Sequence, residues 1–184
     1  VVDEIKSAGG RAAPSVGSVE DGEKRVQDAV DAFGGLHVIV NNAGILRDKS
    51  FAGANEKDWN LVMNVHLRGT YKVCKAAWPI FSKQKYGRII NTTSSVGIYG
   101  NFGQANYAAA KAGMHGFTKA LAQEGARAGI TVNAIAPGYI ATEMVMAVPE
   151  KVRESIVAQI PTGRLGQPEE IARCVVFLAS DDAG

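Results

Sequence analysis

The sequence predicts an α/β fold, a doubly wound parallel sheet with helices on both faces. Three apolar runs of strand-forming residues, at positions 36–40, 88–92 and 130–135, are separated by longer segments with helical periodicity. Strands that are apolar on both faces are typical of parallel sheets, which are connected by helical crossovers. The alternation therefore predicts right-handed crossovers and a sheet covered on both sides.

The first part of the chain is predicted to hold two helices and a doubtful strand. Residues 1–8 have the apolar spacing of a helix, closed by a glycine pair as its C-cap. Residues 11–16 are a short candidate strand. Because it contains Pro14, it is expected to be either an edge strand or an irregular segment. A capping box at residues 18–21 opens the next helix, which ends after Phe33 at a second glycine pair.

The middle of the chain carries two strands and the two longest helical patterns. Residues 36–40 are predicted to form a central parallel strand. A long helix is expected over residues 56–83, with Pro79 kinking or nearly ending it. The strand at residues 88–92 leads to a helix over residues 103–127.

The last part adds one strand and two helices. The strand at residues 130–135 is followed by an Ala-Pro-Gly segment, and residues 142–160 are helical with a polar and Met-rich character. The last helix begins at Pro168, a residue type favoured in the first turn. Both ends of the sequence look cut, so we expect a single truncated domain over residues 1–184.

The composition is that of a globular protein and argues against nucleic-acid-binding and membrane-spanning functions. The chain is 46% apolar and 21% charged with a net charge of +2, and it has no basic run for nucleic acid and no apolar stretch of membrane-spanning length. Cys74 and Cys174 lie in apolar helical patterns and are predicted to be buried free thiols, which suits a reducing compartment. The three dispersed histidines predict no metal site.

Ser94, Tyr107 and Lys111 are the candidate catalytic residues. Tyr107 and Lys111 lie one helical turn apart on one face, and an ammonium beside a phenol is expected to lower the tyrosine pKa. Such a tyrosine can exchange a proton near neutral pH. Ser94 follows the strand at residues 88–92, so its hydroxyl lies where that strand ends. The alternative is an exposed helix that carries Tyr and Lys by chance.

Three unusual segments are predicted to meet at one edge of the sheet. Residues 41–44, Ser94 and residues 137–138 each follow a strand. Ligands of open parallel sheets bind beyond the carboxyl ends of the strands. The sequence therefore predicts a ligand site at this edge.

These motifs resemble those of the short-chain dehydrogenase/reductase family. Five motifs occur here in the order and spacing of that family, over essentially the whole chain. They are Asn-Asn-Ala-Gly after a strand, an Asn within the next long helix, a Ser, Tyr-x-x-x-Lys, and Pro-Gly after a strand. The resemblance implies a Rossmann-like sheet and an NAD or NADP cofactor. The sequence does not choose between the two cofactors.

The resemblance also implies roles for individual residues. Tyr107 would be the general acid/base, Ser94 would polarise the substrate oxygen, Lys111 would hold the nicotinamide ribose, and the carbonyl of Asn64 would hold a water in a proton relay. Further residues would contact the cofactor, namely Asn41, Ala43, Gly44, Pro137, Gly138, Ile140 and Thr142.

The sequence departs from the family in two places. The family opens with a strand, a glycine-rich TGxxxGxG turn and a helix that hold the pyrophosphate, and no such turn occurs in these residues. The first βαβ unit and the last strand are therefore expected to be absent from the sheet. Gly17 stands where the family usually has an Asp near the adenine.

Finer resemblance points to acyl thioesters. The first two thirds are similar to the 3-hydroxyacyl-CoA dehydrogenase domain of peroxisomal multifunctional enzymes, and the last third to bacterial acetoacetyl-CoA and 3-oxoacyl-carrier-protein reductases. We expect interconversion of 3-oxoacyl and 3-hydroxyacyl thioesters, by a homodimer or homotetramer in the cytoplasm or alternatively the peroxisome. Arg47, Lys49 and Arg164 would meet a carrier phosphate or form an ordinary solvated face.

Two other functions stay open. One is a non-catalytic member of the family that no longer binds a dinucleotide, and the other is a reductase for a different alcohol or ketone.

Two histidines and one segment are less informative. His115 continues the row of Tyr107 and Lys111 along the helix but is expected to have a packing or interface role, and His66 is expected to face away from Asn64. The segment at residues 144–146 is either an apolar lid or a surface helix.

Overall fold

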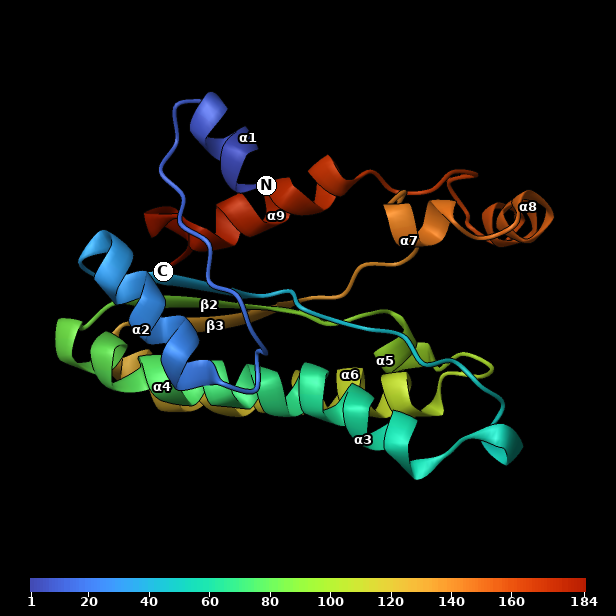
Figure 1. Cartoon of the computed structure of the whole chain (residues 1–184), viewed down its shortest axis with the longest axis horizontal. Helices are drawn as coiled ribbons and strands as arrows, with labels where there is room; N and C mark the ends of the chain where they lie inside the picture. Colours follow the sequence, from blue (N-terminus) through green and yellow to red (C-terminus); the bar gives the residue numbers. More distant parts are fainter.

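A three-stranded parallel sheet forms the centre of the structure, a computed structural model that describes residues 1–184. The strands are β1 (Val38–Asn41), β2 (Gly87–Thr92) and β3 (Ile130–Ile135), in the order β1-β2-β3. Both pairs are parallel, with Ile39 opposite Ile89 and Ile89 opposite Val132. The predicted α/β class is confirmed. Figure 1 shows the strands running together toward the end of the molecule that carries α5 and α7.

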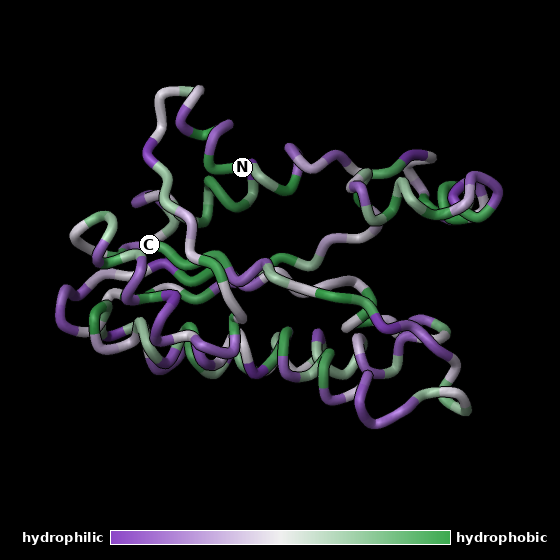
Figure 2. Tube along the Cα trace, in the orientation of Figure 1, coloured by the Kyte–Doolittle hydropathy of each residue, from purple (hydrophilic) through white to green (hydrophobic).

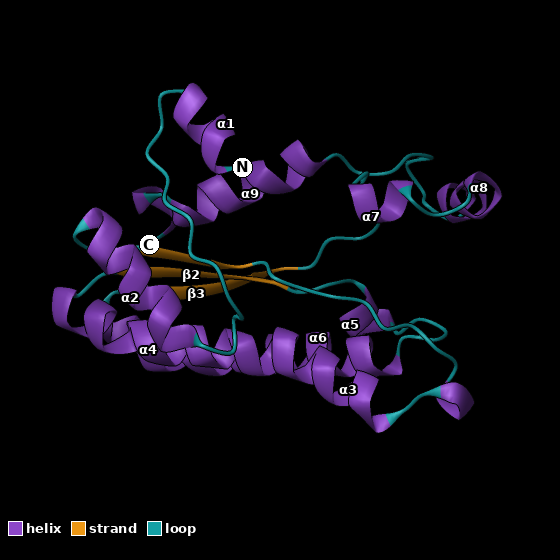
Figure 3. Ribbon diagram, viewed as in Figure 1, coloured by secondary structure: helices purple, strands orange, loops and turns teal.

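Helices cover both faces of this sheet, as predicted. The helices α4 (Gly69–Gln84) and α6 (Ala105–Gly125) pack on one face, and α9 (Pro168–Ala179) packs on the other. The helix α2 (Gly22–Phe33) lies along α4, and α1 (Val2–Ser7) lies on the side of α9 (Figures 1 and 3).

The apolar core lies between the sheet and the helices α2, α4 and α6. Phe81 and Ile89 are fully buried there, and the tube in Figure 2 is hydrophobic along the strands. The complete cluster consists of Val26, Ile39, Cys74, Ala77, Phe81, Ile89, Ile130 and Val132. Burying several such side chains, each worth about 1.5–3 kcal/mol, is what holds the layers together.

One of the two predicted buried thiols is exposed. Cys74 is buried, and burial raises the pKa of its thiol to about 12, so it is inert. Cys174 is exposed on α9, because that helix turns Ile171, Val175 and Leu178 toward the sheet. Both thiols are free.

The N-terminal part differs from the prediction in two places. Residues 11–16 form no strand and are mostly exposed, because no neighbouring strand pairs with them and Pro14 lacks an N–H. The helix α2 begins at Gly22, three residues later than expected, with Asp21 as the N-cap. Its carboxylate accepts from the Lys24 N–H at 3.4 Å. Gly34, in the left-handed conformation at φ 81°, ends the helix as predicted.

The strand β1 starts later than predicted and is not central. It begins at Val38 and lies at one edge of the three strands, where Val40 is 44% exposed. The central strand is β2, whose residues from Gly87 to Asn91 are all buried. An apolar run indicates that a strand is covered on both faces of the sheet, but it does not indicate whether the strand is central or at an edge.

The long helix predicted over residues 56–83 is divided by a π-helical turn. The helix α3 (Glu56–Met63) leads into the π turn Asn64–Arg68, and α4 follows. Pro79 lies inside α4 and does not end it; the helix ends at Lys85, which has a left-handed φ of 58°. The irregularity in this long helix was therefore predicted at the wrong place: it lies at Asn64–Arg68 and not at Pro79.

The remaining elements are short. A helix that was not predicted, α5 (Val96–Tyr99), follows β2, and the helical pattern at 142–160 forms α7 (Glu143–Met146) and α8 (Glu150–Ala158), separated near Pro149. The helix α9 begins at Pro168 as predicted, with a capping box between Gln167 and Glu170. Short 3₁₀ turns occupy Phe51–Gly53, Ala126–Ala128 and Asp181–Ala183. No helix has both the length and the apolar character that crossing a membrane needs.

A buried chain of polar side chains ties the sheet to the helices. The Asn41 side-chain amide donates to Asn91 Oδ1 at 2.8 Å and to the Cys74 sulfur at 3.3 Å. Asn91 in turn donates to Thr118 Oγ1 at 2.9 Å, and Thr118 donates to the carbonyl of Met114 at 2.7 Å. These bonds link β1, β2, α4 and α6 and satisfy groups that would be costly to bury alone.

The close approach of α2 to α4 at Gly22 can be tested by substitution. A Cβ atom at Gly22 would lie 2.3 Å from the Lys72 carbonyl carbon, whereas one at Gly116 would meet nothing within 4 Å. We expect Gly22→Ala to lower the free energy of unfolding by about 1–3 kcal/mol, because the two helices must separate. Gly116→Ala, the matched control within α6, should raise it by up to about 1 kcal/mol. Urea unfolding followed by circular dichroism measures both, and equal effects would contradict the close approach.

Candidate active site

The three segments that follow the strands meet at one edge of the sheet, as predicted. The backbone N–H and the side-chain hydroxyl of Thr93 both donate to the carbonyl of Ile135 at 2.7 Å. The Ser95 N–H donates to the carbonyl of Pro137 at 3.1 Å, so the segments after β2 and β3 are joined. The backbone of Ala43 and Gly44, after β1, is exposed.

Ser94 lies at the end of β2 with its hydroxyl held in place. Its side chain is buried, and its Oγ accepts from the Val96 N–H at 3.2 Å. Because this bond uses a lone pair of the oxygen, the hydroxyl proton remains available to donate. Ser94 is thus a fixed hydrogen-bond donor at the sheet edge.

Lys111 is buried and anchors α6 to the same strand end. Its ammonium donates to the carbonyl of Thr92 at 2.6 Å, and Nζ lies 5.5 Å from the centroid of the Tyr107 ring. Burial lowers the pKa of Lys111 to about 8. The predicted one-turn spacing does bring the two side chains together.

The pKa of Tyr107 is shifted in the direction opposite to the one expected from the sequence. Burial raises it above the usual value, the Ser94 side chain acts to lower it, and the carboxylate of Asp48 acts to raise it. The ammonium of Lys111 points to Thr92 and lies over the ring of Tyr107. Burial of the phenol therefore outweighs any stabilisation of the phenolate, and Tyr107 keeps its proton at neutral pH.

Asn64 is the first residue of the π-helical turn. Its carbonyl accepts from the N–H of Gly69, five residues along the chain. Single turns of this kind within α-helices are frequent at functional sites. The turn packs against α6, the helix of Tyr107 and Lys111.

His66, which is expected from its spacing to face away from Asn64, lies beside Tyr107. The two rings meet edge to face, with centroids 5.2 Å apart and an interplanar angle of 89°. The spacing from Asn64 predicts only that these two side chains point in different directions, and it does not bear on a contact with Tyr107, which lies on α6. The only feature of the sequence that could have indicated this place for His66 is that a histidine occurs inside an apolar helical pattern.

Hydrogen bonds hold the loop at residues 45–50 against the start of α6. Gln104 donates to the carboxylate of Asp48 at 2.9 Å, and the side chain of Asn106 donates to the carbonyl of Arg47 at 3.1 Å. The N–H of Lys49 donates to the carbonyl of Gly103 at 2.8 Å. These polar residues fix the turn that carries Tyr107, and nothing in their local sequence pattern predicted it.

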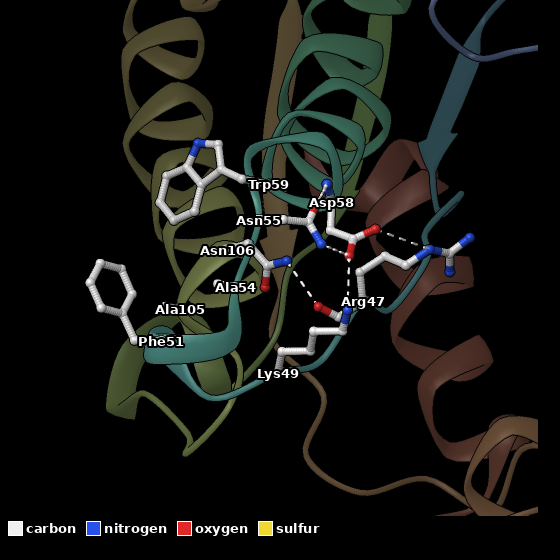
Figure 4. Close-up of a pocket in the computed structure, with 9 residues that line it drawn as sticks. All are labelled: Arg47, Lys49, Phe51, Ala54, Asn55, Asp58, Trp59, Ala105 and Asn106. Carbon is white, nitrogen blue, oxygen red and sulfur yellow. Dashed lines mark hydrogen bonds and ion pairs between the residues drawn. The ribbon is translucent and has the colours of Figure 1, made fainter.

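A small pocket lies between this loop and the starts of α3 and α6 (Figure 4). Its volume is about 10 Å³, too small for an organic substrate. Arg47 and Lys49 line it and approach the carboxylate of Asp58 at 3.9 and 3.7 Å. Arg164 pairs with Glu170 through two contacts of 2.8 Å. All three basic residues suggested for a carrier phosphate are thus engaged in ion pairs at the surface.

The residues expected to contact the cofactor are divided between the sheet edge and the segment after β3. Asn41 turns its side chain inward to Asn91, so only its backbone is left for a ligand. Ile140 pairs with Gly166 in a parallel bridge, which fixes the segment that leads to Thr142 and α7. The remaining positions, Ala43, Gly44, Pro137 and Gly138, lie at the carboxyl ends of β1 and β3.

A larger hollow of about 630 Å³ lies along α7, α8 and the loop that follows. None of Ser94, Tyr107 and Lys111 lines it. Met146 contributes to its wall, and Met144 and Met146 are both about half exposed. No group of three potential metal ligands occurs in the structure, and the Nε2 atom of His115 is buried without a partner.

Comparison with known proteins gives the family. A family model described as Enoyl-(Acyl carrier protein) reductase matches residues 2–184. The chain belongs to the short-chain dehydrogenase/reductase family. Its resemblance to both groups of thioester enzymes is confirmed by the relatives below.

Three relatives illustrate the similarity. The chain is 58% identical over 153 residues to an acetoacetyl-CoA reductase of Shinella zoogloeoides, with 83% of this chain and 64% of the relative covered. It is 51% identical over 181 residues to a peroxisomal hydratase-dehydrogenase-epimerase of Neurospora crassa, with 98% and 19% covered. It is 46% identical over 186 residues to a 3-oxoacyl-[acyl-carrier-protein] reductase of Thermotoga maritima, with 100% and 76% covered. The chain thus spans a fifth to three quarters of the length of these relatives.

Burial of His66 generates a prediction for the pH dependence of stability. Burial, with Lys111 nearby, lowers its pKa from 6.5 to about 4. The unfolded chain takes up this proton first as the pH falls, so the contribution of His66 to stability is lost between pH 6.5 and about 4. The expected loss is roughly 3 kcal/mol. Chemical unfolding at pH values across this interval measures it. His66→Gln lacks the titrating group, and an identical pH dependence in that variant would refute the assignment.

Proposed function

We propose that this chain carries the catalytic part of an NAD(P)-dependent oxidoreductase that interconverts 3-oxoacyl and 3-hydroxyacyl thioesters. The observation that carries the proposal is the meeting of Ser94, Tyr107 and Lys111 at the carboxyl edge of the parallel sheet. In a chance Tyr-x-x-x-Lys pair on an exposed helix, the lysine would not be buried, nor the tyrosine half-buried, beside a strand-end serine. That arrangement favours catalysis over a non-catalytic role.

The substrate class is supported by what the relatives are named for. Acetoacetyl-CoA and a 3-oxoacyl carrier protein are both thioesters with a carbonyl at the 3-position. The Neurospora relative is named for a dehydrogenase combined with a hydratase and an epimerase. A common 3-oxo/3-hydroxy thioester is the simplest substrate class for this chain, with coenzyme A or a carrier protein as the thiol component.

The residues of the site can perform the proton transfer. In the reductive direction the phenol of Tyr107 donates its proton to the carbonyl oxygen at C3, while the hydroxyl of Ser94 donates a hydrogen bond to the same oxygen. The raised pKa of Tyr107 keeps the proton on the phenol at neutral pH, as this direction requires. The carbonyl gains one hydride and one proton and becomes a secondary alcohol.

The donors at the sheet edge fit the nicotinamide part of NAD or NADP. The Lys111 ammonium has three N–H groups and one acceptor, Thr92, so two donors are left for ribose hydroxyls. The exposed backbone of Ala43 and Gly44, and the segment containing Pro137, Gly138, Ile140 and Thr142, would line the cofactor at the strand ends. The bound cofactor supplies or accepts the hydride.

Asn64 is suited to complete a proton path from Lys111. Its carbonyl accepts from the Gly69 N–H, and because a carbonyl oxygen has two lone pairs it could also hold a water. We assign the relay role to this carbonyl, with the π turn aiming it. The single domain over residues 1–184 is proposed to work as a homodimer or homotetramer, in the cytoplasm or in peroxisomes, the compartment in the name of the Neurospora relative.

Replacing Tyr107 tests the proposal directly. We expect Tyr107→Phe to reduce NAD(P)H-dependent turnover of acetoacetyl-CoA by at least about 100-fold, because the proton donor is lost. Tyr99→Phe is the matched control, since Tyr99 is 85% exposed and near the same edge, and it should keep full activity. Oxidation of the reduced cofactor is followed at its absorbance band, with circular dichroism to confirm the fold.

The alternatives are separated by the same assay. Full turnover in Tyr107→Phe would refute the assignment of the general acid. Turnover with simple ketones or steroids but not with the thioester would indicate a reductase for another substrate. Absence of any cofactor binding by the parent chain in a fluorescence titration would favour the non-catalytic role.

A further inference from the structure

We infer that His66 is a positioning residue that clamps the segment after β1 against the ring of Tyr107. The inference rests on the proposed function, because it assigns His66 a task within that site. It is carried by the contacts that the imidazole makes with Gly44, Ile45 and Tyr107. None of the roles implied by the family resemblance includes this side chain.

The π-helical turn brings His66 to this place. His66 is the third residue of the turn Asn64–Arg68, which packs against α6. Its side chain is 2% exposed, so it is enclosed by the surrounding elements. The turn that aims the carbonyl of Asn64 thus also carries an imidazole into the site.

One face of the clamp is the backbone after β1. The Nε2 atom of His66 lies 3.0 Å from the Ile45 N and 2.8 Å from the Ile45 carbonyl oxygen. A neutral imidazole accepts at one nitrogen and donates at the other, so Nε2 makes one of these two bonds in either tautomer. A Cβ atom at Gly44 would lie 2.6 Å from His66 Cε1, so this approach requires glycine.

The other face of the clamp is Tyr107. The edge-to-face contact, with centroids 5.2 Å apart, packs the imidazole against the ring of the half-buried phenol. The ring therefore ties the orientation of Tyr107 to the segment that would line the cofactor. Loss of the ring should expose the phenol, and loss of the Ile45 bond should release the segment.

The imidazole is neutral at neutral pH, because burial lowers its pKa to about 4. The charged and titratable groups that act on it are Lys111 and Tyr107, and the carboxylate of Asp48 acts on Tyr107 from the loop. A protonated His66 would be a second buried cation beside Lys111. Its Nδ1 atom is buried without a partner, so this nitrogen makes no competing contact within the chain.

Two substitutions separate the two contacts. His66→Phe keeps a ring against Tyr107 but removes the hydrogen bond to Ile45. His66→Gln keeps a group that can bond to Ile45 but removes the ring. His115→Gln is the matched control, because His115 also has a buried, unpartnered nitrogen but has no ring contact with Tyr107. Circular dichroism establishes that each variant is folded.

The first readout is independent of activity. The full chain is labelled with ¹³C at tyrosine Cζ, the Tyr107 signal is identified by its loss in Tyr107→Phe, and its ionised fraction is measured at about pH 10, the usual tyrosine pKa. We expect less than half ionisation in the parent, at least about twofold more in His66→Gln, and no change in His66→Phe or in the control.

The second readout is kinetic. With acetoacetyl-CoA as substrate, His66→Gln should lower kcat by roughly 10- to 100-fold, because Tyr107 is displaced. His66→Phe should mainly raise KM for the reduced cofactor. An unchanged Tyr107 signal in His66→Gln would overturn the inference. If the parent chain has no turnover, the proposed function fails, and the ¹³C measurement still decides whether His66 controls Tyr107.

Discussion

The buried ammonium of Lys111 donates to the carbonyl of Thr92 at 2.6 Å, and the arrangement of the site depends on this contact. It joins the second turn of α6 to the end of the central strand, so it fixes both the helix and the position of Tyr107 one turn before it. Ser94 follows Thr92 by two residues and is therefore held in the same corner. A cation buried this deeply needs a good acceptor, and a strand-end carbonyl that is not used by the sheet supplies one.

Small residues and buried amides allow the elements to approach this corner. A Cβ atom at Gly97 would lie 2.8 Å from the backbone of Lys111, so α5 can lie close to α6 only with glycine there. Asn91, fully buried on β2, accepts from Asn41 and donates to Thr118, which keeps β1 and α6 in register with the central strand. The Asn-Asn-Ala-Gly segment therefore has a structural task in its first residue and an exposed backbone in its last two.

The site combines groups that are unfavourable to bury together. Lys111 and His66 both have a lowered pKa, and the phenol of Tyr107 has a raised one, so burial pushes all three toward their neutral forms. Neutral groups cost less to enclose than ions, yet each must still be hydrogen-bonded. Sites of this kind sacrifice some stability to hold groups ready for proton transfer.

The sequence by itself determined the fold class, the strands β2 and β3, and the meeting of Ser94, Tyr107 and Lys111. Those features follow from local periodicity, from apolar runs and from a spacing of four residues on one helix, which needs no knowledge of distant contacts. Only the tertiary structure decided that β1 is an edge strand, that residues 11–16 form none, and that Cys174 is exposed, because each depends on which neighbour packs beside it. The same holds for the raised pKa of Tyr107 and for His66. Burial outweighed the expected effect of Lys111, and the contact of His66 with Tyr107 joins the π turn to α6, two elements whose packing the local sequence does not specify.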